Sequence, residues 1–320
     1  MAASRYRFSP ASVRPLLVLE AVSEMVTAAD WPYKQVRMTL RDQGAEEEFS
    51  FSLFGGAKPS TIEEIARGDL HISILNPASL LTMAYRGVGV FKEPLPVRAI
   101  AVMQSPDRLA FGVAERTGIR TFEELRDKRY PLVVSVRASH DPAVKLLVNQ
   151  VLSIFGFSLD DIVSWGGKVI YDQATGGAPS RIGAFEKGEI DAIFDEAISQ
   201  WAGRGAAAGM HFLPLTDAQL TQLEADGFRR NVISKARFPQ LPADVPCVDF
   251  SGWPIFTSLN APENAIRAFC MALEARKDRI TNTDEPLPLA LMVRDGPEGP
   301  LDVPLHPVAE QVWRELGYLS

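Results

Sequence analysis

Apolar and polar positions alternate along the chain in two patterns, one typical of helices and one of buried strands. Residues 12–29 and the stretch "AVKLLVNQVLSIFGF" repeat apolar positions every three to four residues, so that Val144, Leu147 and Val148 share one helix face. Short apolar runs such as "LHISIL", "VRAIAVM", "PLVVSV" and "KVIYDQ" are typical of buried strands. Because helix-like and strand-like segments alternate along the whole chain, the sequence predicts the α/β class.

One unit of helix, glycine, strand and turn occurs twice. The copies are "STIEEIARGDLHISILNPAS" at residues 60–79 and "SRIGAFEKGEIDAIFDEAIS" at residues 180–199, with Gly68 and Gly188 in equivalent places. A helix that ends at glycine and leads into a buried strand is half of a βαβ crossover, and ligands of open α/β sheets bind where such strands end. The unit therefore indicates two similar lobes, although the same pattern also occurs in α/β proteins without such a repeat.

Several residues are expected to begin or end helices. Ser60 followed by Glu63 is a capping-box pattern, and Thr121 is expected to cap the helix "TFEELRDK". Gly227 is expected to end the helix "DAQLTQLEAD". Residues 282–304 are rich in proline and acidic side chains and are predicted to form a surface excursion before the final helix, "PLHPVAEQVWRELGYL".

Length and charge narrow the classes of function. The 320 residues suit two domains or one large one, and the net charge of −7 excludes a strongly basic nucleic-acid surface. No apolar run reaches the roughly 18 residues that cross a bilayer. The start, "MAASRYRFSPASVRPLLVLEAV", has no adequate signal-peptide core, so a cytoplasmic location is expected for this chain, or a periplasmic one if a signal lies upstream or was trimmed.

The chain has two cysteines, Cys247 and Cys270. Two are too few for a disulfide scaffold or a cysteine metal site. They could pair in an oxidising compartment, but Cys270 falls on an apolar helix face and is expected to be a small core residue.

Together with its surroundings, the repeat resembles the TAXI group of solute-binding proteins, the substrate receptors of TRAP-type transporters. The resemblance covers roughly residues 50–320 and is carried by four stretches. They are the pair "ARGDLHISIL" and "EKGEIDAIFDEA", the run "GIRTFEELRDKRYPLVVSVRASHDPAVKLLVNQVLSIFGFSLDDI", "FLPLTDAQLTQLEADGF", and the closing "PLHPVAEQVWRELGYL". The chain departs from the family in lacking a glycine-rich opening and in carrying Val308 where a glycine is usual.

The resemblance implies a two-lobed, type II periplasmic-binding-protein-like architecture with a ligand cleft between the lobes. Lobe 1 would comprise residues 1–115 and 250–320, and lobe 2 residues 116–249, with the chain crossing near 114–120 and again near 210–255. The implied function is capture of a small, anionic organic molecule, a carboxylate or an amino acid, by hinge closure. TRAP membrane subunits would be the partner, with no cofactor, metal or nucleic acid.

The main candidate site is "RASHD", where a strand ends and a helix begins. The backbone N–H groups of Ser139 and His140 and the Ser139 hydroxyl suit a carboxylate, and Arg137 could clamp it. The alternatives are that Ser139 or Asp141 merely caps the helix and that Arg137 is exposed or forms an ion pair between the lobes.

Further candidates lie at other strand ends and loops, each with a plain structural alternative as a turn, loop, helix-end or core residue. Asp195 and Glu196 could hold an ammonium group. The remaining ligand-binding candidates are Gly55, Gly56, Lys58, Asn76, Ser79, Tyr171, Gln173 and Trp253.

An enzyme on the same fold is the rival interpretation. The four histidines, His71, His140, His211 and His306, are scattered, and His306 is expected to be structural. No metal-binding, nucleophile-elbow, P-loop or dinucleotide motif is present. A cytoplasmic decarboxylase of an aromatic or heteroaromatic acid would use His140, Arg137 and Asp195. A ligand-sensing module without catalysis is a third possibility.

Overall fold

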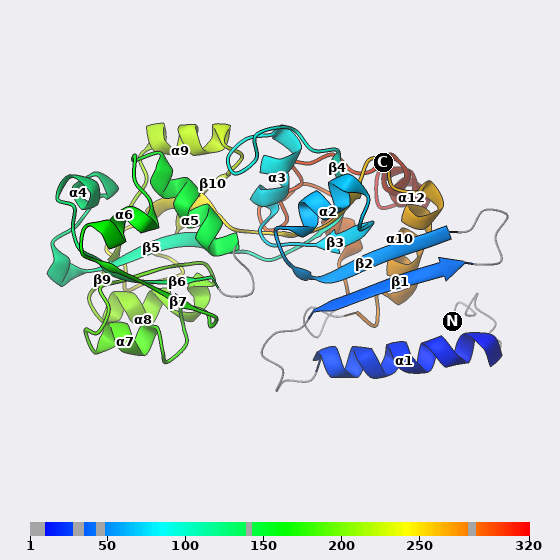
Figure 1. The fold of residues 1–320 in the computed structure, drawn as a ribbon, viewed down its shortest axis with the longest axis horizontal. Helices are drawn as coiled ribbons and strands as arrows, with labels where there is room; N and C mark the ends of the chain where they lie inside the picture. Colours follow the sequence, from blue (N-terminus) through cyan, green and yellow to red (C-terminus); the bar gives the residue numbers. More distant parts are fainter. Residues whose placement is uncertain (1–9, 28–34, 43–48, 139–142, 281–285) are drawn as a thin grey trace.

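The computed structural model describes residues 10–27, 35–42, 49–138, 143–280 and 286–320. Within these residues the chain forms two β-sheets, each with its own helices, and Figure 1 shows the two groups of elements side by side. The predicted α/β class is confirmed. None of the helices in the described ranges is both long enough and apolar enough to cross a bilayer.

The first sheet has the strand order β1-β2-β3-β12-β4. Its strands are β1 (Val36–Asp42), β2 (Phe49–Ala57), β3 (Ile72–Ile74), β4 (Val97–Met103) and β12 (Trp253–Ser258). Strand β3 runs parallel to β2, whereas β12 is antiparallel to both of its neighbours. The helices of this half are α1 (Pro10–Thr27), α2 (Thr61–Arg67), α3 (Ala78–Arg86), α10 (Glu263–Arg276), α11 (Leu289–Met292) and α12 (Pro307–Glu315).

The second sheet has the order β10-β11-β5-β8-β6-β7, and β9 also pairs with β5. Its strands are β5 (Arg108–Ala114), β6 (Val133–Arg137), β7 (Lys168–Asp172), β8 (Ala192–Asp195), β9 (Met210–Phe212), β10 (Arg230–Ile233) and β11 (Val245–Asp249). The helices are α4 (Phe122–Asp127), α5 (Ala143–Ser153), α6 (Leu159–Ser164), α7 (Ile182–Glu186), α8 (Ala202–Ala207) and α9 (Asp217–Ala225), with short 3₁₀ turns at η1 (Glu115–Thr117) and η2 (Ile198–Gln200).

The chain passes between the sheets twice, through residues 104–107 and residues 250–252. The two crossing segments run side by side, since the N–H of Phe250 donates to the carbonyl of Asp107 at 3.0 Å and that of Gly252 to the carbonyl of Ser105 at 3.1 Å. Strand β5 belongs to the second sheet, so the first crossing comes earlier than the expected 114–120. The division into two domains stays a prediction.

Apolar side chains of both halves meet near the crossings. One buried cluster contains Leu80 and Met83 of α3 together with Leu220 and Leu223 of α9. Two further clusters are each confined to one half, one beneath α10 and α12 and one around Trp201. The two sheets therefore share part of their core.

Both copies of the repeated unit adopt the predicted structure. Helices α2 and α7 are followed by Gly68 and Gly188, whose φ angles of 81° and 76° lie in the left-handed region that favours glycine. In each copy the next residue donates its N–H into the last helical turn at 2.9 Å, Asp69 to Glu64 and Glu189 to Ala184. Strands β3 and β8 follow in equivalent places.

Two local predictions are wrong. The Ser60 side chain does not cap α2; the Thr61 hydroxyl instead donates to the carbonyl of Lys58 at 2.7 Å. Residues 286–304 are not a plain surface excursion, because their apolar side chains enter the core beneath α10 and α12, and the short helix α11 forms there. The apolar residues buried in this core are Leu287, Leu289, Met292 and Val293, and Val303 is buried in the cluster that the two halves share.

Other local predictions are confirmed. The Thr121 hydroxyl accepts the N–H of Glu124 as the cap of α4, and Gly227 follows the end of α9. Cys270 is fully buried in the first half and Cys247 is buried in the second, and both thiols are free. Burial raises the pKa of the Cys270 thiol to about 12, so it is not a reactive thiolate near neutral pH.

Candidate functional site

The two strand-end turns of the repeated unit are both hydrogen-bonded to the crossing segments. In the first half, the N–H of Ala78 donates to the carbonyl of Ser251 at 3.2 Å. In the second half, the N–H groups of Ala197 and Ile198 donate to the carboxylate of Asp107 at 2.7 and 3.3 Å. The Ser251 hydroxyl joins the two crossing segments by donating to the carbonyl of Asp107 at 3.0 Å. The repeat thus brings one strand-end turn from each half to the same place.

The turn of the first half carries polar atoms that nothing in the described chain satisfies. The structure leaves three buried side-chain polar atoms of the described residues without a hydrogen-bond partner, and two of them are Asn76 Oδ1 and Ser79 Oγ. Ser79 is only 9% exposed and lies in the first turn of α3, where helical N–H groups have no partner within the helix. This turn is suited to a group that both accepts and donates hydrogen bonds.

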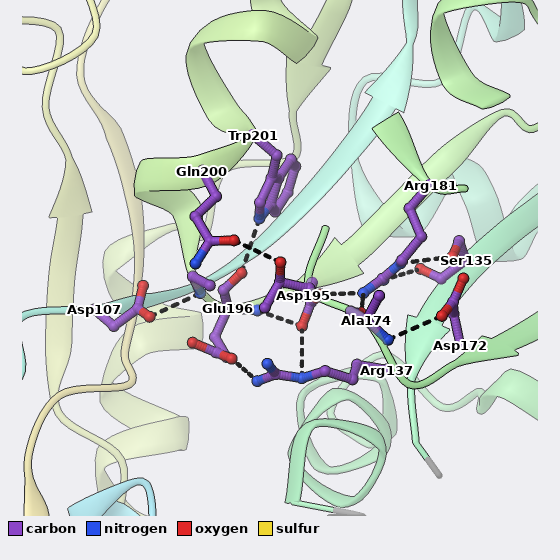
Figure 2. A network of polar contacts seen from close by, with 12 residues as sticks. Asp107, Ser135, Arg137, Asp172, Ala174, Arg181, Asp195, Glu196, Gln200 and Trp201 are labelled. Atoms are coloured by element: carbon purple, nitrogen blue, oxygen red, sulfur yellow. Dashed lines mark hydrogen bonds and ion pairs between the residues drawn. The ribbon is translucent and has the colours of Figure 1, made fainter. Parts of the chain in front are cut away.

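The turn of the second half rests on a buried arginine, Arg181. Its side chain is 0% exposed, and it forms an ion pair with Asp195, whose side chain is also 0% exposed. Arg181 Nε donates to the Ser135 hydroxyl at 2.8 Å and Nη2 to the Ser135 carbonyl at 3.1 Å. Nη1 also donates to the carbonyl of Ala174 at 2.8 Å (Figure 2). Arg181 therefore ties β6, β8 and the loop after β7 together.

A second arginine, Arg137, lies on the other side of Asp195. Its Nε is 3.6 Å from Asp195 Oδ1, and its Nη2 forms an ion pair with Glu196 (Figure 2). The side chain of Arg137 is 21% exposed and that of Glu196 is 7% exposed. Arg137 is therefore the guanidinium of this cluster that remains accessible.

Burial raises the pKa values of the carboxyl groups in this cluster, and nearby charges and hydrogen bonds oppose that rise. Burial raises the pKa of Asp195, and the charges of Arg181 and Arg137 oppose that rise. Burial also raises the pKa of Asp107, opposed by the backbone N–H groups of Arg108, Ala197 and Ile198. Asp249 lies next to the second crossing. Burial raises its pKa as well, and hydrogen bonds from Ser251 and Asn231 oppose that rise.

Arg229 adds an ionic contact between the second sheet and the C-terminal segment. Its Nε and Nη2 donate to the two carboxylate oxygens of Asp302 at 2.7 Å each, and Nη2 also donates to Asp295 at 2.6 Å. These charge-assisted hydrogen bonds raise the pKa of Arg229, so it stays charged. The C-terminal segment is thereby fixed beside the crossings.

The structure places the remaining candidates as follows. Gly55 and Gly56 lie near the end of β2, with Gly55 and Lys58 exposed. Trp253 is half-buried at the start of β12, opposite Met103. Tyr171 is 44% exposed, with Lys145 Nζ 4.7 Å from the centre of its ring, and Gln173 is exposed. Ser139, His140 and Asp141 lie outside the described residues. The ligand-binding role of every candidate stays a prediction.

The catalytic alternative requires Asp195 and Arg137 at a reacting centre. Asp195 is fully buried between two arginines, and Arg137 is bound to Glu196, so neither is free in this structure. Within the described ranges there is no group of three or more His, Cys, Asp or Glu side chains placed to hold a metal ion. His306 is structural, as expected, since its Nδ1 accepts the N–H of Val308 at the start of α12.

A surface hollow lies away from the two turns. It has a volume of about 270 Å³ and is lined by residues at the start of β3 and the end of β12, among them His71 and Ser258. Asn76 follows the other end of β3. This hollow is therefore separate from the candidate site.

Sequence reasoning missed Arg181 and Asp107. In the sequence Asp107 lies in the turn "QSPD" between two apolar runs, and Arg181 is one polar residue before a short helix of the repeated unit, so neither is marked as a buried residue. The one available signal was that "AIFDE" ends a fully apolar strand in two acids, which need cationic or N–H partners if they are buried.

Comparison with known proteins gives one family. The profile of the NMT1-like family matches residues 54–317. No curated protein sequence matches the chain.

Solved structures that resemble this chain at low sequence identity include binding proteins of small molecules. The alkanesulfonate-binding protein SsuA from Xanthomonas axonopodis pv. citri, bound to MOPS, is 14% identical over 68% of this chain and 62% of that one, with a TM-score of 0.26. The glycine betaine and L-proline-binding protein ProX from Borrelia burgdorferi is 12% identical over 67% and 66%, with a TM-score of 0.35.

A third is a TRAP periplasmic solute-binding protein from Roseobacter denitrificans with bound β-D-glucuronate, 15% identical over 67% of this chain and 61% of that one, with a TM-score of 0.26. The chain thus spans less than two-thirds of the length of each of these three structures.

Proposed function

The chain belongs to the NMT1-like family, and from that premise we propose that it is a solute-binding protein which holds a small organic molecule between two lobes. Residues 1–115 with 250–320 would form one lobe and residues 116–249 the other, apart from the earlier crossing at 104–107. The proposal is supported by the meeting of the two strand-end turns at the crossing segments. A hinge at these crossings would let both turns contact one ligand.

The unpartnered polar atoms of Asn76 and Ser79 carry this proposal. A buried polar atom without a partner costs about 1–3 kcal/mol, so a bound group that supplies the missing hydrogen bonds gains that amount. A carboxylate suits Ser79 Oγ and the N-terminal end of α3, where the helix dipole favours negative charge. An N–H or O–H donor suits Asn76 Oδ1.

These features favour a carboxylate or an amino acid as the ligand. In the TAXI-type interpretation the protein would act in the periplasm and deliver this ligand to TRAP membrane subunits. Ligand contacts with both lobes would favour the closed form, because only a ligand with different affinity for the two forms shifts their balance.

The test combines identification of a bound molecule with one substitution. Native mass spectrometry of the freshly purified protein, followed by denaturation, is expected to release an intact small carboxylate or amino acid. Ser79→Ala should weaken binding of that compound at least about tenfold in calorimetry, since a hydrogen bond to a charged group is worth about 1.5–3 kcal/mol.

Ser79→Ala should leave the free energy of unfolding within about 1 kcal/mol of wild type, because its hydroxyl has no partner in the protein. Ser164→Ala, at an exposed hydroxyl at the end of α6, is the matched control and should bind as wild type does. A protein that neither carries nor binds any carboxylate or amino acid, or a Ser79→Ala variant with unchanged affinity, contradicts the proposal.

A further inference from the structure

The accessible cation at the turn of the second half, Arg137, is already paired with a carboxylate of the protein. Arg137 is the partly exposed guanidinium of the cluster, and Glu196 forms an ion pair with its Nη2 (Figure 2). Arg181 is fully buried and is bound to Asp195. A ligand carboxylate that approached Arg137 would meet a fixed carboxylate beside it.

Glu196 is held firmly in this position. Its N–H donates to Asp195 Oδ1 at 2.9 Å, and its carbonyl accepts Trp201 Nε1 at 2.8 Å. The next residue, Ala197, has a left-handed φ of 53° and donates its N–H to Asp107 at 2.7 Å. A non-glycine residue adopts this conformation only when its surroundings enforce it. The backbone from which the Glu196 side chain reaches Arg137 is therefore fixed, and the side chain, 7% exposed, is itself nearly buried.

The charges around this turn do not favour a second anion. Two carboxyl groups, those of Asp195 and Glu196, pair with the guanidinium groups of Arg137 and Arg181. A third, that of Asp107, accepts the N–H of Ala197 in the same turn. The first turn, by contrast, offers Ser79 and the start of α3 without an acidic residue in the first helical turn. One anionic group can thus be accommodated in the first half, and the described residues of the second turn do not favour another.

We propose that Glu196 is a specificity determinant that restricts the ligand to a single carboxylate by neutralising Arg137. This inference rests on the proposed function and names the class of ligand: a monocarboxylate whose other polar groups are neutral or cationic. A dicarboxylate would be rejected because its second charge would be desolvated beside Glu196, where the described residues of this turn offer no free cation.

The test uses matched probes that differ only in the second carboxylate. Binding of butanoate and succinate, pentanoate and glutarate, and hexanoate and adipate is measured by calorimetry at one salt concentration and one pH. In the wild type, the monocarboxylate of at least one pair should bind more tightly than its dicarboxylate. Glu196→Gln keeps the shape of the side chain and frees the charge of Arg137, so the affinity ratio should shift about tenfold toward the dicarboxylate.

Three further variants keep the test decisive. Glu186→Gln removes the same charge from an exposed ion pair with Arg204 in the same half and should leave the ratio unchanged. Arg137→Gln should shift the ratio away from the dicarboxylate, and the Glu196→Gln/Arg137→Gln double variant should show a coupling between the two residues. The Arg137→Gln variant gives a result even if Glu196→Gln alone does not fold.

The outcomes separate this inference from the proposed function. A ratio that is the same in Glu196→Gln and wild type, or that moves equally in Glu186→Gln, overturns the role of Glu196 while ligand binding stands. A wild type that prefers the dicarboxylates also overturns it. If the wild type binds no carboxylate or amino acid at all, the proposed function fails first, and the inference fails with it.

Discussion

Replacing Arg181 with methionine tests whether the buried ion pair is a main support of the second half. The substitution keeps most of the volume and the linear shape of the side chain but removes the charge. It leaves Asp195 fully buried, with Arg137 Nε at 3.6 Å as its remaining guanidinium contact. It also removes the donors that reach the Ser135 hydroxyl, the Ser135 carbonyl and the Ala174 carbonyl.

The expected loss follows from these contacts. Breaking a buried ion pair by removing one partner typically costs about 3–5 kcal/mol, because the other charge is left uncompensated. Both side chains are 0% exposed, so water cannot take the place of Arg181. We therefore expect Arg181→Met to lower the free energy of unfolding by about 3–5 kcal/mol at pH 7.

The penalty should also depend on pH. Burial raises the pKa of Asp195, and Arg181 is the first of the charges that oppose this rise. Without Arg181 the folded-state pKa lies still further above the unfolded value of about 3.9. The folded variant then takes up a proton that the unfolded chain does not, so the variant regains stability relative to wild type as the pH falls from 7 to 5.

Urea unfolding followed by circular dichroism, at pH 7 and pH 5, measures both effects. Arg204→Met is the control, because Arg204 forms an exposed ion pair with Glu186 and should cost less than about 1 kcal/mol. The reasoning is refuted if Arg181→Met costs no more than Arg204→Met at pH 7, or if its penalty is the same at both pH values.

Two further predictions concern packing and the crossing segments. Gly112→Ala should cost about 1–3 kcal/mol in thermal or urea unfolding, because the new Cβ would lie 2.3 Å from Met210 Sδ. Gly183→Ala, in α7, should be neutral or stabilise by up to about 1 kcal/mol, because its Cβ would meet nothing within 4 Å beyond its own helix and chain neighbours. Equal effects of the two substitutions would contradict the packing. Asp107→Asn replaces one acceptor oxygen by an NH₂ group that faces backbone donors, so it should cost about 1–3 kcal/mol and weaken ligand binding as well; unchanged unfolding and unchanged affinity would show that the turn of β8 does not depend on it.

The repeated unit was the part of the fold that the sequence predicted best. Its helix end depends on a local rule, since Gly68 and Gly188 both need a left-handed φ, and the apolar run after each glycine can only be buried. Such features are decided within a few residues. The two strands that follow were predicted for the same reason.

Features that depend on distant contacts were predicted poorly. Prolines made residues 286–304 look exposed, yet Leu287 and Met292 are buried because they pack into the core cluster with residues of α10 and α12. There, local propensity was overridden by packing between segments distant in sequence. The Ser60 prediction failed for a local reason: its side chain makes no cap hydrogen bond, and the Thr61 hydroxyl bonds the carbonyl of Lys58 three residues earlier.

The candidate site shows the same division. Asn76 and Ser79 were identified because they follow an apolar strand, and the structure leaves their polar atoms unpartnered. Arg181 could not be identified, because its partners Ser135 and Asp195 are 46 and 14 residues away in sequence. A charged residue is usually exposed, so its burial follows only from the assembled sheet.

The place of β12 in the first sheet has a consequence for the order in which the two halves fold during synthesis. β12 lies between β3 and β4, so the first sheet lacks an inner strand until residue 258 has left the ribosome. Every strand of the second sheet lies between residues 108 and 249 and is available earlier. The second sheet is therefore expected to fold before the first during synthesis. The N-terminal strands of the first sheet can form their complete sheet only after β12 has been synthesised.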